Sequence, residues 1–298
     1  MVSSQQIYWR SHYSDRNLAM RLFNKYFNAS LLSTVYIFGP LHSACADELA
    51  TTDALNTFTD TRSVLGDGFA AADESTRWGL GAGVGVSQSP YKSYGTQVSP
   101  IPIIYVENKW VRILGPNIDG KLGSIDNFSF TMRARAALGE GYKSSDSTIF
   151  HGMNKRSGGV WLGPTVSWDS PIAYLSAEIL GDASGNSKGA QATLSASKSY
   201  NFGDFEVTPR IATTWLSSNY VNYYYGVGIS EAASDRIAYK GKSTVNLDLG
   251  VRANYKIDIH QSVLLGIGIQ QLGDGITNSS LVDRSTVSEL MAGYVYRF

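Results

Sequence analysis

Hydrophobic and polar residues alternate along most of the chain from Arg77 to its end. The clearest case is KSTVNLDLGVRANYKI (242–257), in which every second residue from Val245 to Ile257 is apolar or aromatic. The positions between them are mostly polar or charged. The alternation recurs in 128–138, 205–215 and 262–270. Because successive side chains of a strand point to opposite faces, this pattern predicts β-strands with one apolar and one polar face.

Two all-β architectures produce such strands. A soluble sandwich packs the apolar face inward, whereas a transmembrane barrel turns it towards lipid and lines its lumen with the polar face. The runs of ten to sixteen residues are longer than ordinary strands and suit a tilted membrane-spanning strand. Aromatic residues gather at the ends of these runs, as in the girdles of outer-membrane barrels. Strand length and aromatic placement therefore favour the barrel.

The connections between the runs alternate in length, which supports the same choice. Short connections are predicted at 169–171, 201–204 and 258–261, and longer ones at 140–156, 182–189, 218–240 and 273–287. Membrane barrels have short periplasmic turns and longer outer loops, and a sandwich has no reason for this alternation. We therefore expect an all-β fold, a closed antiparallel transmembrane β-barrel, with the C-terminus and the short turns in the periplasm.

The number of strands depends on one segment. Eleven runs are visible, but bacterial barrels have even strand numbers. Splitting the run 109–122 at Gly115-Pro116 restores the parity, because proline cannot donate to a strand ladder. We expect about twelve strands, and ten remain the alternative.

The first residues predict export. Arg21 and Lys25 precede the short apolar run ASLLSTVYIFGPL, and Ala44, Ala46 and Asp47 form a small-x-small cleavage site followed by an acid. An acylated Cys45 is the weaker alternative, because Leu41 is one residue too far away for a lipoprotein signal. We expect an upstream extension at 1–19, a signal peptide at 20–46, a flexible segment at 47–76 and the barrel at 77–298.

Composition adds few constraints on partners. Charged residues are 17% and the formal net charge is zero, so nothing indicates nucleic-acid binding. Cleavage after Ala46 would remove the single cysteine and leave a net charge of about −3. A mature chain without cysteine has no disulfide framework.

The chain ends in SELMAGYVYRF, with Tyr294, Tyr296 and Phe298 on one strand face. A closing strand with alternate aromatic residues and a terminal phenylalanine suits an outer-membrane barrel whose last strand pairs with its first. We expect these three residues to form the signal for the barrel-assembly machinery. The predicted location is the outer membrane of a Gram-negative cell, in contact with its lipid.

Charged residues on the polar strand faces should point into the lumen. The candidates are Arg133, Arg135, Glu178, Glu206, Arg210, Lys242, Asp248 and Arg252. One interpretation is a salt-bridged plug that stabilises the barrel, and the other is a narrow charge-selective pore. A count of twelve strands does not distinguish the plug from the pore. The lumen of such a barrel is intermediate between the filled interior of eight-strand barrels and the open channel of sixteen-strand porins.

The sequence offers no catalytic, cofactor-binding or metal-binding set. Glycines at 79, 81, 83 and 85 share one strand face, which is the wrong spacing for a phosphate-binding loop. We expect them to leave room in the lumen for long side chains opposite. His151 lies in a predicted outer loop and His260 in a tight turn, and no metal-ligand cluster is apparent.

Several stretches resemble the MipA/OmpV family of outer-membrane proteins. They are 77–123, with its glycine-rich strand, Pro-x-Pro strand and GKLG ending, the segment FHGMNKRSGGVWLGPTVSW (150–168), the NYYYGVGISEA loop (222–232) and the Tyr-x-Phe end. The resemblance covers nearly all of the expected mature chain. It implies an outer-membrane barrel without known catalysis. The family's named member is an adaptor between a murein lytic transglycosylase and a murein synthase, and other members are discussed as porin-like, osmotically regulated or adhesive proteins.

Three functional hypotheses follow. The first is a non-enzymatic scaffold or adaptor for murein proteins, with a periplasmic murein hydrolase or synthase as its partner. The second is a narrow porin-like channel for small polar solutes. The third is an outer-membrane hydrolase that uses His151 and the outer loops.

Overall fold

The computed structural model describes residues 76–137 and 140–298. The predicted upstream extension, the signal peptide with Ala44, Ala46 and Asp47, and the N-terminal segment up to residue 75 lie outside the described residues. The fold is therefore that of the predicted barrel region.

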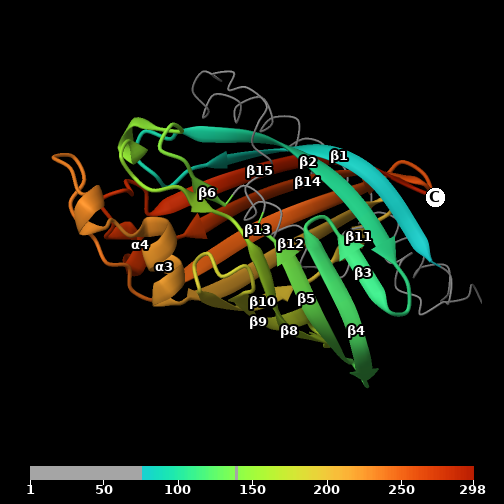
Figure 1. The fold of residues 1–298 in the computed structure, drawn as a ribbon. Helices are drawn as coiled ribbons and strands as arrows, with labels where there is room; N and C mark the ends of the chain where they lie inside the picture. Colours follow the sequence, from blue (N-terminus) through green and yellow to red (C-terminus); the bar gives the residue numbers. More distant parts are fainter. Residues whose placement is uncertain (1–75, 138–139) are drawn as a thin grey trace, which may run out of the picture. The chain divides into compact units, whose positions relative to one another are not determined.

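Twelve antiparallel strands form one closed sheet (Figure 1). They are β1 (Arg77–Gln88), β2 (Thr96–Glu107), β3 (Val111–Leu114), β4 (Asn117–Ile125), β5 (Phe128–Ala136), β8 (Val160–Asp169), β9 (Tyr174–Asp182), β10 (Ala190–Ser197), β12 (Phe205–Leu216), β13 (Thr244–Lys256), β14 (Gln261–Gln271) and β15 (Thr286–Arg297). The short β11 (Tyr200–Phe202) continues β10 along β12. The pairing of β1 with β15 joins the first and last strands of the barrel, and the pairing of β10 with β12 completes the ring. The predicted closed barrel with twelve strands is confirmed.

The two ends of the barrel differ in their connections. At the end that we call the short-turn end, the strands are joined by 108–110, 126–127, 170–173, 203–204 and 257–260. At the long-loop end they are joined by 89–95, 137–159, 183–189, 217–243 and 272–285. The long connections contain β6 (Gly141–Tyr142), η3 (Thr148–Phe150), β7 (Arg156–Ser157), α3 (Ser218–Tyr225), η4 (Ile229–Glu231) and α4 (Asp274–Thr277). None of the helices in the described part of the chain is long and apolar enough to cross a membrane.

The apolar strand faces point outward and the polar faces point inward. On β13, Leu247 and Leu249 are exposed, whereas Asn246, Asp248 and Arg252 are buried. A water-soluble protein would bury the apolar set, so this inversion places the outer face against lipid. Backbone groups of such a wall need partners within the sheet, and closure of the barrel provides them along most of the wall.

The β3–β4 hairpin interrupts the wall. Its two-residue turn is Gly115-Pro116, and Gly115 has a φ of 55°, which glycine adopts at little cost. The turn confirms the predicted split of 109–122, but β3 has only four residues. It pairs with β2 over 105–107 alone, so no described strand pairs with 96–103 on the side away from β1.

The edge of β2 that has no strand partner over 96–103 is the edge towards which the N–H groups of residues 100 and 102 would point. Both residues are prolines, which have no N–H group. The carbonyl of Ile104 accepts a hydrogen bond from the N–H of Gly115 (3.0 Å), so Ile104 directs its backbone groups away from β1. Residues two apart in an antiparallel strand direct these groups to the same side. Pro100 and Pro102 therefore occupy positions whose N–H groups would point into the interruption. Proline is tolerated in a strand at such edge positions.

The seam between β1 and β15 is built from glycines. A Cβ atom on Gly81 would lie 2.2 Å from the carbonyl oxygen of Tyr294, so only glycine permits the observed approach. At the short-turn end of the seam, the ring of Phe298 stacks on that of Trp78, with centroids 3.9 Å apart. Gly85 leaves space for a side chain of the neighbouring strand. A Cβ atom on Gly85 would lie only 3.1 Å from the side chain of Ile101, which packs over the glycine. The lumen near this seam holds a small apolar cluster, formed by Ile101, Ile103, Tyr105, Leu114, Leu264, Met291 and Val295.

Candidate functional site

A network of buried ion pairs lies on the inner faces of β4, β5 and β9. Arg133 donates two hydrogen bonds to Asp119 (2.7 and 3.0 Å) and one to Glu178 (2.8 Å). Arg135 donates to both carboxylate oxygens of Glu178 (2.7 and 2.9 Å) and to Asn117 (3.0 Å). The two arginines and two acids balance in charge, and all are nearly inaccessible to solvent. This pairing, in which each charge has several hydrogen bonds, fixes β4, β5 and β9 relative to one another.

The remaining lumen candidates lie on β12 and β13, with one exception. Glu206 and Arg252 are buried with 4.0 Å between their charged atoms, Arg210 is half-buried, and Asp248 accepts a hydrogen bond from Gln270 (2.7 Å). Lys242, which we expected on the inner face, lies before β13 and is exposed. The strand begins at Thr244, so the alternation that was extended back to Lys242 does not apply there.

Sequence reasoning missed Asp119 and Asn117, which complete the ion-pair network. From the sequence we predict a break in the run 109–122, but we do not predict which residues after the break face the lumen. Once the chain turns at Gly115-Pro116, Asn117 and Asp119 are alternate residues of a new strand and share its inner face. The signal that could have found them is therefore the strand parity counted from the turn.

The long-loop end is covered by a packed cap. We define the cap as the connections 89–95, 137–159, 217–243 and 272–285. Its buried core is mostly aromatic and aliphatic, and includes Tyr91, Tyr142, Phe150, Met153, Tyr220, Val221, Tyr224, Val227, Ile276 and Leu281. The rings of Tyr142 and Phe150 stack with centroids 4.0 Å apart, and Tyr91 contacts both. The loops of the cap thus pack around a hydrophobic core of their own.

Helix α3 brings three consecutive tyrosines into the cap. It begins after Ser217, whose side chain accepts a hydrogen bond from the N–H of Tyr220 (3.4 Å), and it ends at Gly226. Serine is favoured at this position because its oxygen satisfies an N–H group that has no partner within the helix. Tyr220, Val221 and Tyr224 form the buried side of the helix.

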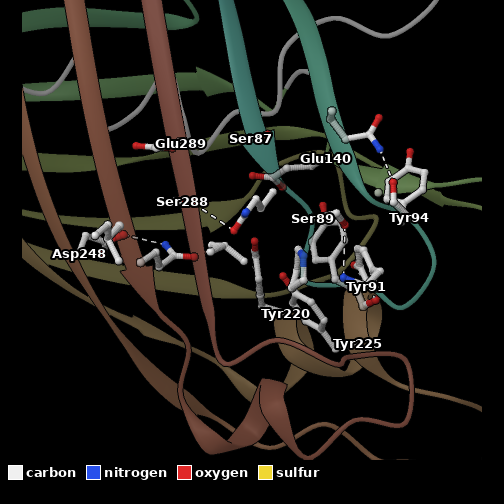
Figure 2. Close-up of a pocket in the computed structure, with 18 of the residues that line it drawn as sticks. Ser87, Ser89, Tyr91, Tyr94, Glu140, Tyr220, Tyr225, Asp248, Ser288 and Glu289 are labelled. Carbon is white, nitrogen blue, oxygen red and sulfur yellow. Dashed lines mark hydrogen bonds between the residues drawn. The ribbon is translucent and has the colours of Figure 1, made fainter. Parts of the chain in front are cut away.

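A cavity of about 110 Å³ lies beneath the cap (Figure 2). Its wall is formed by residues of β1, β2, β13, β14 and β15, and its cover by the 89–95 connection, Glu140 and α3. The lining includes five tyrosines, Tyr91, Tyr94, Tyr220, Tyr224 and Tyr225, and three acids, Glu140, Asp248 and Glu289. No lysine, arginine or histidine lines it among the described residues.

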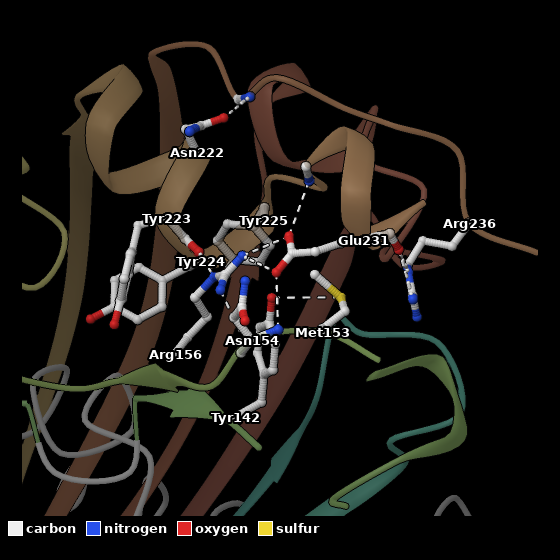
Figure 3. A network of polar contacts seen from close by, with 12 residues as sticks. Tyr142, Met153, Asn154, Arg156, Asn222, Tyr223, Tyr224, Tyr225, Glu231 and Arg236 are labelled. Carbon is white, nitrogen blue, oxygen red and sulfur yellow. Dashed lines mark hydrogen bonds and ion pairs between the residues drawn. The ribbon is translucent and has the colours of Figure 1, made fainter. Parts of the chain in front are cut away.

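An ion pair links two segments of the cap (Figure 3). Arg156 donates to both carboxylate oxygens of Glu231 (3.0 and 2.9 Å) and to the carbonyl of Tyr223 (2.7 Å). Glu231 also accepts from the N–H groups of Asn154 (2.9 Å) and Gly228 (3.0 Å). Burial opposes ionisation of this carboxyl group, but the two N–H groups and the guanidinium outweigh it and hold the pKa of Glu231 below its ordinary value.

Replacing Glu231 with glutamine should loosen the cap by about 1.5–3 kcal/mol, because charge-assisted hydrogen bonds are replaced by weaker ones. We expect faster tryptic cleavage within 217–243 at neutral pH. A carboxyl group with a lowered folded pKa stabilises the fold above its unfolded pKa, and this contribution is lost as the pH falls through the folded value. The near-ultraviolet circular dichroism of the cap tyrosines should therefore show an acid transition in the wild type that is reduced in the variant. The exposed Asp283, replaced with asparagine, is the control, and equal behaviour of both variants would contradict the prediction.

The two histidines among the described residues, His151 and His260, are not brought together with a serine and an acid. The side chain of His151 is exposed and makes no hydrogen bond to a serine or an acid of the described chain. His260 lies in the 257–260 turn, with its Nδ1 atom 3.0 Å from the carbonyl oxygen of Arg297. In the described ranges, no three His, Cys, Asp or Glu side chains are placed to hold a metal ion.

Comparison with known proteins finds relatives that match most of this chain. The chain is 31% identical to the MltA-interacting protein of Escherichia coli over 225 residues, which cover 74% of this chain and 90% of that protein. It is 23% identical to the putative outer membrane protein YiaT of E. coli, over 77% of this chain and 94% of that protein. It is 26% identical to the outer membrane protein OmpV of Vibrio cholerae, over 60% and 68%. Among solved structures, the NanC porin matches with a TM-score of 0.36 and 11% identity, over 75% of this chain and 100% of that one.

The family model described as MltA-interacting protein MipA matches residues 80–298, which include every strand of the barrel except the first residues of β1. Relatives from this group are named outer-membrane proteins. The apolar outer face of the barrel is what such a location requires. The chain therefore belongs to the MltA-interacting protein family, the MipA/OmpV family, of outer-membrane β-barrel proteins.

Proposed function

We propose that the protein is a non-enzymatic scaffold of the outer membrane that holds a murein lytic enzyme at its short-turn end, which faces the periplasm. The observation that carries the proposal is a set of apolar side chains exposed on the short turns. Ile172 is 77% exposed, Ile259 is 82% exposed and Trp110 is 66% exposed. Exposed apolar groups on turns, where polar residues are usual, favour contact with another protein.

An interfacial girdle is the competing explanation for this set. Girdles are made of tryptophan and tyrosine within the strand ends. Ile172 and Ile259 are aliphatic and lie within the turns, beyond Asp169 and Lys256, the last residues of their strands. Trp110 fits either explanation, so the two isoleucines carry the argument. The name of the E. coli relative, MltA-interacting protein, supports the same class of partner.

The channel hypothesis has less support from the interior. Six of the predicted lumen residues are buried, and Arg133, Arg135 and Glu178 among them are paired within one network. The cap covers the long-loop end with an apolar core. Both features favour the predicted salt-bridged plug over a solute pore.

The test is capture of a purified murein lytic transglycosylase by the detergent-solubilised full chain. The variant Ile172→Asp/Ile259→Asp should retain at least tenfold less enzyme than the wild type, because two apolar contacts become charged. The matched control is Ile229→Asp/Ile237→Asp, which makes the same change on the cap, where these residues are 91% and 72% exposed. The control should retain the enzyme as the wild type does.

Equal retention by both double variants, or by an unrelated barrel, would remove the proposal. Planar-bilayer recording of the same preparation addresses the channel. Discrete conductance without enzyme capture would replace the scaffold by the channel, whereas the scaffold hypothesis expects capture and no discrete conductance.

A further inference from the structure

The cavity beneath the cap is lined by acidic and aromatic side chains and by no basic ones among the described residues. Its lining combines three carboxyl groups with five tyrosine rings. The cavity lies at the end of the barrel opposite to the turns that carry the scaffold proposal. Any ligand held there concerns an activity separate from that proposal.

The cavity wall places two of its acids on the inner faces of β13 and β15, which both pair with β14. Asp248 on β13 is paired in register with Gln270 on β14, and Gly268 on β14 is paired with Glu289 on β15. A Cβ atom on Gly268 would lie 2.5 Å from the Glu289 Oε1 atom, so this glycine allows the carboxylate to lie against the wall. Two carboxylates thus lie on strands separated only by β14 and are offset by two residues along it, about 12 Å apart at the backbone by the usual strand spacing and rise.

Asp248 is the more buried of the two acids of the wall. Its side chain is only 9% exposed, and its Oδ1 atom accepts a hydrogen bond from Gln270 (2.7 Å). No described group donates a hydrogen bond to its Oδ2 atom, although the residue lines the cavity. Arg210 on β12 is the one cation in electrostatic contact with it. The Oδ2 atom is therefore an acceptor that a donor within the cavity can reach.

The cover supplies aromatic groups and the third acid. The rings of Tyr91 and Tyr225 are stacked with centroids 5.3 Å apart, and Tyr220 and Tyr224 are in contact at 4.8 Å. Glu140 lies close enough to Tyr224 to interact electrostatically with its hydroxyl group, which donates a hydrogen bond to the carbonyl of Ser157 (3.4 Å). Figure 2 shows Tyr91, Tyr220 and Tyr225 on one side of the space, with Asp248 and Glu289 across from them. Aromatic rings together with carboxylates attract ammonium groups through cation–π and ionic interactions.

We propose that the cavity beneath the cap binds a small organic cation, a substituted ammonium ion, between the tyrosines of the cap and the carboxylates of Asp248 and Glu289. The described acids are not grouped closely enough to hold a metal ion, so a ligand with an alkyl body and one delocalised or shielded charge fits better. The cavity volume of about 110 Å³ admits a compact ligand and excludes a peptide.

The probe is choline chloride, and its neutral isostere is 3,3-dimethylbutan-1-ol, which has the same shape without the charge. Both are titrated calorimetrically into the full chain folded in a non-ionic detergent, because zwitterionic detergents carry ammonium groups that would compete. We expect binding of choline and at least tenfold weaker binding of the alcohol. Equal binding of the two, or no binding of choline, would overturn the proposal.

Variants locate the site. Asp248→Asn/Glu289→Gln should weaken choline binding at least tenfold, and Asp283→Asn, an exposed acid of the cap that does not line the cavity, should leave it unchanged. Ser87→Lys is the second variant, because it adds an ammonium group to the wall without removing an acid, and it should abolish binding. Heat-modifiable migration on gels establishes that each variant is folded. Binding that survives both cavity variants would place choline elsewhere and overturn the proposal.

Discussion

Replacing Glu178 with glutamine is expected to lower the free energy of unfolding by about 3–5 kcal/mol, the usual cost of breaking a buried ion pair from one side. Glu178 is the only acid that contacts both Arg133 and Arg135 in the network on β4, β5 and β9. Its loss leaves two buried guanidinium groups with Asp119 as their one remaining carboxylate there. Urea unfolding of the protein in lipid vesicles, followed by tryptophan fluorescence, measures the change.

Two further variants separate the buried charge from a general effect of mutation. Arg135→Met/Glu178→Met removes one pair and leaves Arg133 bound to Asp119, so it should be markedly more stable than the single variant. Glu107→Gln breaks a partly exposed ion pair with Lys121 (2.6 Å) and should cost about 1 kcal/mol or less. If the double variant were as unstable as Glu178→Gln, the network would not act through charge balance.

Replacing Gly81 with alanine should prevent stable closure of the barrel. The added methyl group would lie 2.2 Å from the Tyr294 carbonyl oxygen, and a backbone atom in a paired strand cannot move aside as a side chain can. Strand β1 would have to separate from β15, at a cost of about 3 kcal/mol or more, the upper range for overpacking. We expect little heat-modifiable protein in the outer membrane.

The same substitution at Gly181 is the matched control for Gly81. Gly181 is also in a strand, and a Cβ atom there would have no neighbour within 4 Å. Its replacement should be neutral or stabilising by a few tenths of a kcal/mol to about 1 kcal/mol, because alanine restricts the unfolded chain. Similar loss of folded protein from both variants would show that the seam has no special sensitivity to added volume.

The strands were predictable because the alternation of apolar and polar residues within each strand is a local signal. A membrane strand must satisfy lipid on one face and the lumen on the other, so the alternation in 242–257 specifies both its extent and its orientation. The strand ends were less well defined, as the misplacement of Lys242 shows. Beyond the last paired residue, the alternation of polar and apolar residues has no structural constraint.

The cap was not predictable from the sequence in the same way. Tyr91, Phe150 and Tyr224 meet in one core although they lie on three different connections. Nothing local in each connection encodes its packing against the others. The Ser217 cap and the Gly226 end would have predicted α3, but not the cavity beneath it.

The interruption beside β2 has a consequence for how copies of the chain behave towards one another. A free strand edge is a template on which another chain can add its own strand, and such addition leads to aggregation. On this edge, an added strand would find no N–H donor at Pro100 or Pro102, and two of its carbonyl groups would lose their hydrogen bonds. The Pro-x-Pro pair thus makes this open edge of β2 a poor template for a strand from a second copy of the chain.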